Sequence, residues 1–450
     1  MSSEGTRCVD AFTVALNQAC EGGGKRWYTS TLELQLASLE LCRACRRMPT
    51  LRVRVDSSTP RTLWYTRETQ NEDPDKRSSK VRITSRVPVV RPLGVKWELS
   101  TAGLKQSAAI EQWAGSLQQL SFGDAFNVDI AGAVWPASLQ KLSFGRHFNQ
   151  PIVGVAWPAS LQQLSFGTNF NQPIVGVVWP PYLEQLSFRN DFNKPIAGVV
   201  WPASLRQLSF GGYFNQPIAR VVWPASLRQL SLGKRFNQHI AGVVWPASLQ
   251  KLSLGDSFRE SIVSVVWPAS LRQLSIGHSF KRPIAGITWP ATLQEIFVGY
   301  SFNQPIDGVV WPASLQKLTF GACFNQPIAE VVWPPFLQQL SFGEWFNQPI
   351  AGVVWPASLQ QLSFGNMFRG AFNQPIAGVL WPASLQKLSF GKQFNKSIAG
   401  VVWPASLKQL TFGQEFNQPS AEVGWPASLE AVTRLERVGT SARCHEVSLL

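Results

Sequence analysis

The sequence predicts a solenoid, a stack of about fifteen similar coils of roughly 22 residues each, and two observations predict it. Trp followed by Pro recurs every 22 residues from Trp135 to Trp355, and three further pairs follow at Trp381, Trp403 and Trp425. The apolar residues between these pairs alternate over stretches too short for a helix. Because a unit this short cannot bury its own apolar side, each unit must stack on the next.

Residues 157–178 form one complete unit, and their pattern predicts which elements a coil contains. Leu161 to Phe166 alternates apolar and polar residues, which is typical of a strand. Pro158 and Pro173 remove hydrogen-bond donors and favour extended backbone before them, so no long helix fits. We therefore expect a parallel β-sheet on the concave face and extended or 3₁₀ legs on the convex side.

Stacking aligns identical residues of successive units into ladders. Each large apolar side chain contributes about 1.5 to 3 kcal/mol when fully buried. The residue after the second Phe of each unit is Asn in twelve of fourteen units, as at Asn171, and we expect its amide to satisfy backbone groups in the turn. The inward set expected in this unit is Trp157, Leu161, Leu164, Phe166, Phe170, Ile174 and Val177.

The pattern L-x-x-L-x-F-G-x-x-F-N-Q-P-I resembles the FNIP repeat, a short leucine-rich-repeat variant. The W-P-x-S-L segment before it is similar to the L-P-x-x-L of short bacterial leucine-rich repeats. The resemblance covers about residues 113–430. It implies a curved leucine-rich-repeat-like solenoid with a binding role, attached in some members to F-box or kinase domains, neither of whose patterns occurs in residues 1–112.

Outside the repeats the domain organisation is less regular. Residues 1–67 are predicted to form an N-terminal region, small and helical or mixed. Residues 68–100 include a charged stretch, 68–85, and are predicted to be a polar linker or disordered. The solenoid is assigned to 101–430, and 431–450 to a C-terminal cap or tail with a polar outer coil.

Composition limits the environment more than the function. Of the net charge of +14, residues 1–100 carry +6 and residues 101–433 carry +7, too dilute an excess to imply a partner alone. Six cysteines with one close pair fit a reducing compartment. The sequence has neither an apolar signal segment nor a run long enough to span a bilayer. We expect an intracellular protein, cytoplasmic rather than nuclear.

Catalytic and metal-binding patterns are sparse. The four histidines do not cluster, and no two carboxylates occupy the same position in adjacent units, so we expect no enzyme and no cofactor. Cys42 and Cys45 alone have metal or redox spacing. A tetrahedral site needs four ligands, so we interpret this pair as part of an apolar helix in 32–48 and expect no metal.

Positions that vary between units are the candidates for binding. Basic residues at outward positions beside the strands are Arg206, Arg228, Lys251 and Arg272. Phe297 interrupts a column of Ser and Thr, and Tyr300 follows three residues later, as in an aromatic interface hot spot. The alternative is an apolar strand without a partner.

Four extra residues between Trp355 and Trp381 give a second candidate. Met367, Phe368 and Arg369 lie in this insertion, and with Trp345 they are predicted to form an exposed apolar knob with a cationic rim. The alternative is a duplication slip that forms a loop without function.

The asparagine column is broken in successive units by Arg259 and Lys281, with Arg282 beside the second. Long cations cannot replace a buried amide, so we expect them to point outward and form a basic corner. The sequence thus predicts a non-enzymatic scaffold that binds an unidentified protein through the concave face and the adjoining turns. The alternative is nucleic-acid or other polyanion binding by the basic middle of the array; partner and oligomeric state are left open.

Overall fold

The computed structural model describes residues 51–56, 62–66, 81–84, 95–99, 118–133, 135–365, 369–420, 423–438 and 441–447, with side chains between 118 and 433. The chain divides into two units. The first comprises residues 1–194 and 199–205, and the second comprises residues 195–198 and 206–450. Cys42 and Cys45 lie outside the described residues.

The first unit begins with four strands that precede the regular coils. β1 pairs antiparallel with β2, β2 pairs antiparallel with β3, and β4 pairs parallel with both β1 and β5. β3 and β4 fall within residues 68–100, where the sequence predicts a linker or a disordered segment; both alternate apolar and polar residues, as strands do. The strands are β1 Leu51–Asp56, β2 Thr62–Thr66, β3 Val81–Thr84, β4 Val95–Leu99, β5 Gln119–Phe122, β6 Lys141–Ser143, β7 Gln163–Ser165 and β8 Gln185–Ser187.

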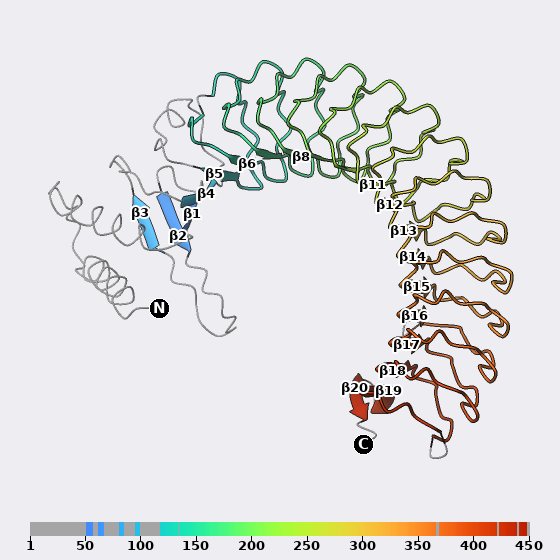
Figure 1. The fold of residues 1–450 in the computed structure, drawn as a ribbon. Helices are drawn as coiled ribbons and strands as arrows, with labels where there is room; N and C mark the ends of the chain where they lie inside the picture. The colour runs from blue at the N-terminus through green and yellow to red at the C-terminus, as the bar shows by residue number, and fades with distance from the viewer. Residues whose placement is uncertain are drawn as a thin grey trace, which may run out of the picture. The chain divides into compact units, whose positions relative to one another are not determined.

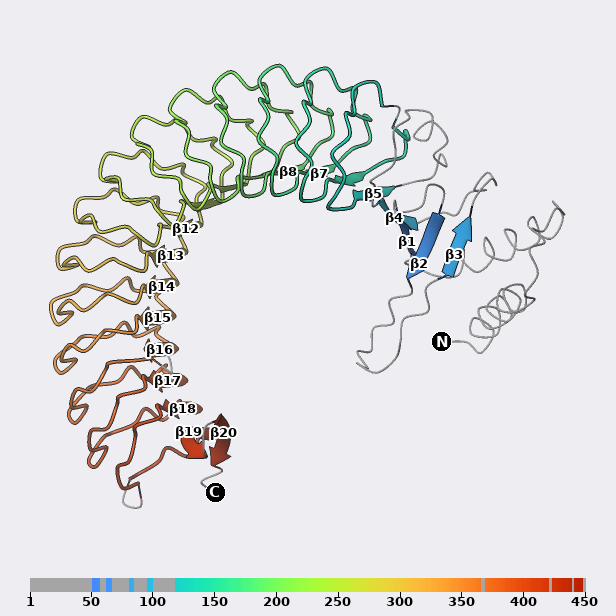
Figure 2. The same cartoon turned by 180° about the vertical axis from the view of Figure 1, so that it is seen from behind.

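The second unit contains one strand per coil and ends in a hairpin. Its coil strands pair in parallel from β9 to β19, and β20 pairs antiparallel with β19. Within this unit the strands lie on the inner, concave side of the curved stack (Figures 1 and 2). They are β9 Gln207–Ser209, β10 Gln229–Ser231, β11 Lys251–Ser253, β12 Gln273–Ser275, β13 Glu295–Val298, β14 Lys317–Phe320, β15 Gln339–Phe342, β16 Gln361–Phe364, β17 Lys387–Phe390, β18 Gln409–Phe412, β19 Ala431–Val438 and β20 Ser441–Val447.

Sheet register places equivalent residues of successive coils side by side. Leu230 pairs with Leu252, and Ser231 pairs with Ser253. The register continues past the insertion, because Leu362 pairs with Leu388, 26 residues later. The four extra residues are therefore accommodated outside the sheet.

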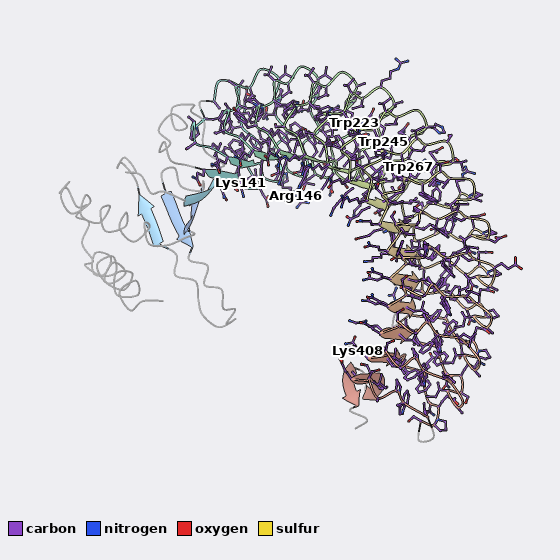
Figure 3. All side chains as sticks on the ribbon, viewed as in Figure 1. Lys141, Arg146, Trp223, Trp245, Trp267 and Lys408 are labelled. Carbon is purple, nitrogen blue, oxygen red and sulfur yellow. The ribbon has the colours of Figure 1, made fainter. Side chains whose placement is uncertain are left out.

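The core consists of the ladders that the sequence predicts. Leu161, Leu164, Phe166, Phe170 and Ile174 are at most 1% exposed. Tryptophans of neighbouring coils stack with ring centroids 5.9 to 6.5 Å apart in the pairs 135–157, 179–201, 223–245, 267–289, 289–311, 333–355, 381–403 and 403–425. Figure 3 shows Trp223, Trp245 and Trp267 as a row inside the stack. Thirteen of the buried indole N–H groups have no acceptor within the described chain, so ring packing rather than hydrogen bonding holds these rows.

The return leg of each coil is extended chain broken by turns. Of the two alternatives that the sequence left, extended or 3₁₀, the described residues adopt the first, and they contain neither an α-helix nor a 3₁₀-helix. Tight turns in the leg use glycine with positive φ, as at Gly176 (φ 84°). Ser160 Oγ donates to the carbonyl of Leu139 one coil earlier at 2.7 Å, so the leg too is tied to its neighbour.

Candidate interaction surface

The asparagine column is a ladder of hydrogen bonds between coils. The backbone N–H of Asn171 donates to Oδ1 of Asn149 at 2.9 Å. The Nε2 of Gln172 donates to the backbone oxygen of Asn149 at 2.9 Å and to its Oδ1 at 3.1 Å. Because each amide oxygen serves the coil that follows, the near-invariance of Asn and Gln here is explained by stacking.

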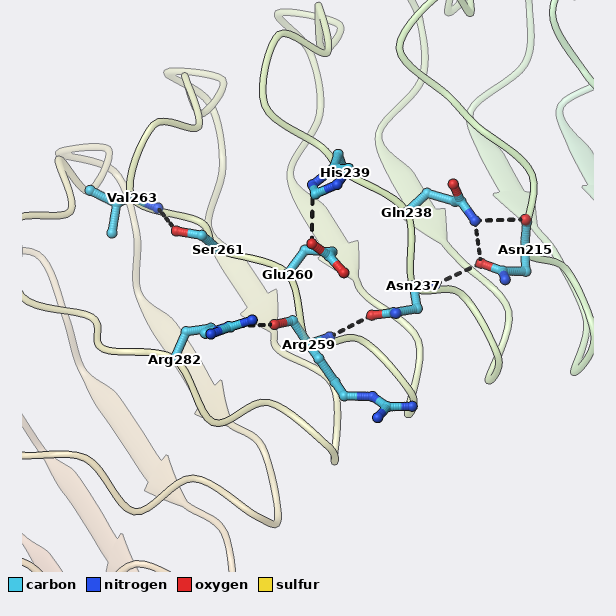
Figure 4. Close-up of polar contacts among 9 residues, drawn as sticks. All are labelled: Asn215, Asn237, Gln238, His239, Arg259, Glu260, Ser261, Val263 and Arg282. Atoms are coloured by element: carbon cyan, nitrogen blue, oxygen red, sulfur yellow. Dashed lines mark hydrogen bonds and ion pairs between the residues drawn. The ribbon is translucent and has the colours of Figure 1, made fainter.

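The ladder stops where the sequence substitutes cations. Arg259 N–H still donates to Oδ1 of Asn237 at 2.8 Å, but Arg259 has no amide oxygen to offer to the next coil (Figure 4). Arg259, Lys281 and Arg282 are all exposed. Arg282 does not simply point outward, since its Nε donates to the backbone oxygen of Arg259 at 3.2 Å and takes over part of the role of Gln.

An ion pair lies beside the break. Nδ1 of His239 is 3.0 Å from a carboxylate oxygen of Glu260, and both residues flank the ladder positions (Figure 4). His239 is 86% exposed and Glu260 is 23% exposed, so the carboxylate is held against the protein. This pair could not be predicted from spacing within one unit, because the two residues come from different coils.

The four predicted basic residues beside the strands are exposed. Lys251 lies on β11 next to buried Leu252, so it faces away from the core. Arg228 precedes β10, and its backbone oxygen accepts the N–H groups of Gln250 and Lys251 at 2.8 and 3.0 Å. Arg206 and Arg272 occupy the position of Arg228 in their own coils and are likewise exposed.

Phe297 and Tyr300 adjoin His278, which was not among the residues predicted to bind a partner. The ring of His278, one coil earlier, lies 6.2 Å from that of Phe297 and 6.4 Å from that of Tyr300. Phe297 is half-buried and Tyr300 is 43% exposed. Nδ1 of His278 is 3.6 Å from a carboxylate oxygen of Asp256. Asp256, His278 and Tyr300 occupy the same position in three successive units. An alignment of the units could therefore have predicted that they are neighbours.

The insertion alters the predicted knob. Met367 precedes a Phe in the sequence, as Cys323 and Trp345 do, but the backbone register assigns the position of Trp345 to Ala371. Trp345 N–H donates to the oxygen of Ala322, and Ala371 N–H donates to the oxygen of Glu344, the same bond one coil later. In the same way, the backbone oxygen of Gly370 accepts the N–H of Gln393 in the next coil at 2.8 Å. Gly370 therefore occupies the position that Glu344 has in the preceding coil.

Trp345 and Arg369 are the members of the predicted knob that the structure describes. Trp345 is 57% exposed, and Arg369 is exposed. Met367 and Phe368 lie outside the described residues. A large indole that the packed core does not cover is the feature expected of an interface anchor.

Further exposed aromatic residues escaped the sequence analysis. Tyr182 and Phe336, 66% and 63% exposed, replace the serine of the return leg, and a Pro-Pro pair before each was the available signal. Tyr213, 43% exposed, lies under the guanidinium of Arg235, 4.1 Å from the ring centroid. Such a cation–π pair needs two coils and is therefore invisible within one unit.

A column of exposed aliphatic residues was also missed. The residue before each Trp is 79% to 85% exposed in ten coils, whereas its predecessor is buried, as with Val243 at 5% and Val244 at 80%. The column is Val178, Val200, Val222, Val244, Val266, Val310, Val332, Val354, Leu380 and Val402. Core packing does not explain why these positions are aliphatic.

Titratable groups give little support for catalysis. Partial burial raises the pKa of the Cys323 thiol, with a further increase from Glu344 and an opposing decrease from Lys281. In the part of the chain with described side chains, no group of three His, Cys, Asp or Glu residues could hold a metal ion. The same part contains no helix of the length and hydrophobicity needed to cross a membrane.

The repeat length, the parallel strand in each coil and the stacked apolar columns define a leucine-rich-repeat-like solenoid. The family model described as FNIP Repeat matches residues 148–191, 192–235, 236–279, 324–367 and 372–414. The chain is an FNIP-repeat protein, and the family resemblance expected from the sequence is confirmed.

Two solved structures place the fold among leucine-rich repeats. CroV588, a novel circular LRR protein, is 36% identical with a TM-score of 0.63; the match covers 76% of this chain and 58% of that one. This chain therefore spans less than two thirds of CroV588. A structure of the Toll–Spätzle complex of Drosophila is 10% identical with a TM-score of 0.54, covering 84% of this chain and 57% of that one, a likeness in fold only. No curated protein matches the sequence.

Proposed function

We propose that this chain is a non-enzymatic scaffold that binds a protein partner through its strand face and its turn edge. The turn edge denotes the residues between each strand and the following Pro-Ile position, such as 167–172. Phe297 and Tyr300 lie at the junction of the two surfaces, and Trp345 lies on the turn edge two coils beyond Tyr300. Arg206, Arg228, Lys251 and Arg272 extend the proposed surface along the strands.

One observation carries the proposal. The buried apolar columns and the asparagine column repeat because they form the core and the hydrogen-bond ladders, whereas Tyr300 and Trp345, which depart from the repeat, are exposed and Phe297 is half-buried. Stacking does not require Tyr300 or Trp345, because Ala322 and Gln393 occupy the same columns in other coils. Exposed aromatic side chains beside basic ones have the composition of interaction hot spots.

The proposal is tested by replacing these aromatic residues with residues that the same columns already contain. In the variant Phe297→Ser, Tyr300→Ala, Trp345→Gln, we expect partner affinity to fall at least tenfold while the urea midpoint stays unchanged. Affinity purification with quantitative mass spectrometry first identifies the partner, and titration of the purified partner measures its affinity. Phe336→Ser is the matched control, because it removes an exposed aromatic residue from the return leg. Equal affinity in both variants would reject the aromatic surface.

The exposed cations on the strand side support a second candidate, binding of nucleic acid or another polyanion. Phosphate contacts make affinity fall steeply with salt concentration, whereas apolar hot spots do not. A salt series with single-stranded RNA, comparing the native chain with Arg228→Gln, Lys251→Gln, separates the two candidates. The aromatic residues of the strand side do not recur at the regular spacing typical of base stacking.

We also propose a cytoplasmic location, because the cysteine usage fits a reducing compartment.

A further inference from the structure

We propose that the break in the asparagine ladder is an oxyanion site that binds a phosphoryl group. The site consists of the backbone N–H groups of Lys281 and Asn303 and the side chains of Arg259, Lys281 and Arg282. Its occupant would be a phosphorylated residue of the protein partner, so this inference rests on the proposed function and adds the chemistry that the partner must bring.

The two N–H groups lack acceptors because of the substitutions. In intact coils the N–H at this position donates to the Asn Oδ1 of the preceding coil, as from Asn325 to Asn303 at 2.9 Å. Arg259 and Lys281 have no side-chain oxygen, and neither Lys281 N–H nor Asn303 N–H makes a hydrogen bond within the described chain. Two successive amides therefore present unpaired donors at one place on the turn edge.

The side chains around these donors are positively charged. Arg259, Lys281 and Arg282 are exposed, so they can close on a ligand without breaking the core. Arg282 uses its Nε on the Arg259 oxygen, and a guanidinium has four further N–H donors.

The carboxylate next to Arg259 in the chain is paired elsewhere. Glu260 follows Arg259, but its carboxylate is 3.0 Å from His239 and is held on that side of the coil (Figure 4). The side chain of Asn303 resumes the ladder, because its Oδ1 accepts hydrogen bonds from the N–H of Asn325 at 2.9 Å and from Nε2 of Gln326 at 3.0 Å. The unpaired donors are thus confined between two intact stretches of ladder.

Charge balance selects the class of anion. A phosphate monoester has a charge between about −1.5 and −2 near neutral pH and three strong acceptor oxygens. A carboxylate has a single charge and two oxygens. Three cations with two backbone donors match the phosphoryl group better, and arginine is well suited to bind it by two parallel hydrogen bonds.

The test restores the ladder to its own consensus. In the variant Arg259→Asn, Lys281→Asn, Arg282→Gln, each residue becomes the one that other coils have, so the fold should be retained. Isothermal titration with inorganic phosphate and with N-acetyl-phosphoserine amide at fixed ionic strength should show saturable binding to the native chain. We expect binding by the variant to be at least tenfold weaker, because charge-assisted hydrogen bonds are lost.

The control removes equal charge elsewhere. Lys141→Gln, Arg220→Ser, Lys387→Gln also loses three positive charges, in other coils and at positions where other coils have Gln or Ser, and should bind phosphate as the native chain does. An equal loss in both variants, or native binding of N-acetyl-glutamate amide as strong as that of phosphoserine amide, would overturn the site. Binding of free phosphate without phosphoserine would also overturn the partner assignment. Because these probes bypass the aromatic surface, failure here is distinguishable from failure of the scaffold proposal.

Discussion

In most coils the strand is followed closely by a glycine whose side-chain space is filled by the preceding coil, Arg189 being an exception. A Cβ placed on Gly255 would overlap the carbonyl oxygen of Gly233 and lie 3.0 Å from the Cβ of Phe236. Backbone therefore meets backbone at this column, and the contact repeats at Gly233 and Gly277. The Phe-Gly step of the repeat is a packing requirement at the level of single atoms.

We expect Gly255→Ala to lower the free energy of unfolding of the array by about 1 to 3 kcal/mol, because the backbone must shift to admit the methyl group. Urea denaturation followed by tryptophan fluorescence measures the change. Gly424→Ala is the comparison, since no atom lies within 4 Å of its built Cβ, its φ is not positive, and Val402 occupies the same column one coil earlier. A midpoint for Gly255→Ala that matches the native chain would contradict the packing role.

At the residue scale the sequence predicted the buried set well and the contacts between coils poorly. Phe166 and Phe170 are identifiable because alternation within one unit shows which side is apolar. The pairings of His278 with Asp256 and of Arg235 with Tyr213 join different coils, so they require the register between units as well as the pattern within one.

At the scale of the element, the return leg has two apolar neighbours with opposite environments. Val243 is buried and Val244 is exposed, because successive side chains of an extended segment point to opposite sides. Hydropathy alone assigns both valines to the core, so the exposed column was not predicted from the sequence. The short strands, in contrast, were predicted correctly from alternation between Pro-bounded turns.

The same substitution should change stability by different amounts at these two adjacent positions of the return leg. Val243→Thr should destabilise the array by about 1 to 3 kcal/mol, since it buries a hydroxyl group without a designed partner. Val244→Thr should change stability by less than about 0.5 kcal/mol. The urea midpoints of the two variants check this, and equal destabilisation by both would show that Val244 is covered in solution.

At the scale of the whole molecule, the repeat predicted the class of fold, and the family match confirmed it. The position of the insertion was predicted from the 26-residue step, but the residues displaced were misassigned. Met367 appeared to continue the column of Trp345 because a Phe follows it, whereas the hydrogen bond of Ala371 to Glu344 shows that the column resumes after Gly370. Counting residues along the sequence could not show where the column resumes after an insertion, because this depends on the hydrogen bonds between coils.

The central claim is that successive coils lie over one another in register, and a disulfide scan tests it most directly. Ser231 and Ser253 pair across β10 and β11, so their Cα atoms should be about 4.8 Å apart, within disulfide reach. Ser231 and Ser275 are two coils apart, about 9.6 Å, and out of reach. In a chain whose native cysteines are replaced by alanine, mild oxidation of Ser231→Cys, Ser253→Cys should give an intramolecular disulfide, and Ser231→Cys, Ser275→Cys should not. Cross-linking of the distant pair, or none in the adjacent pair, would contradict the stacked solenoid.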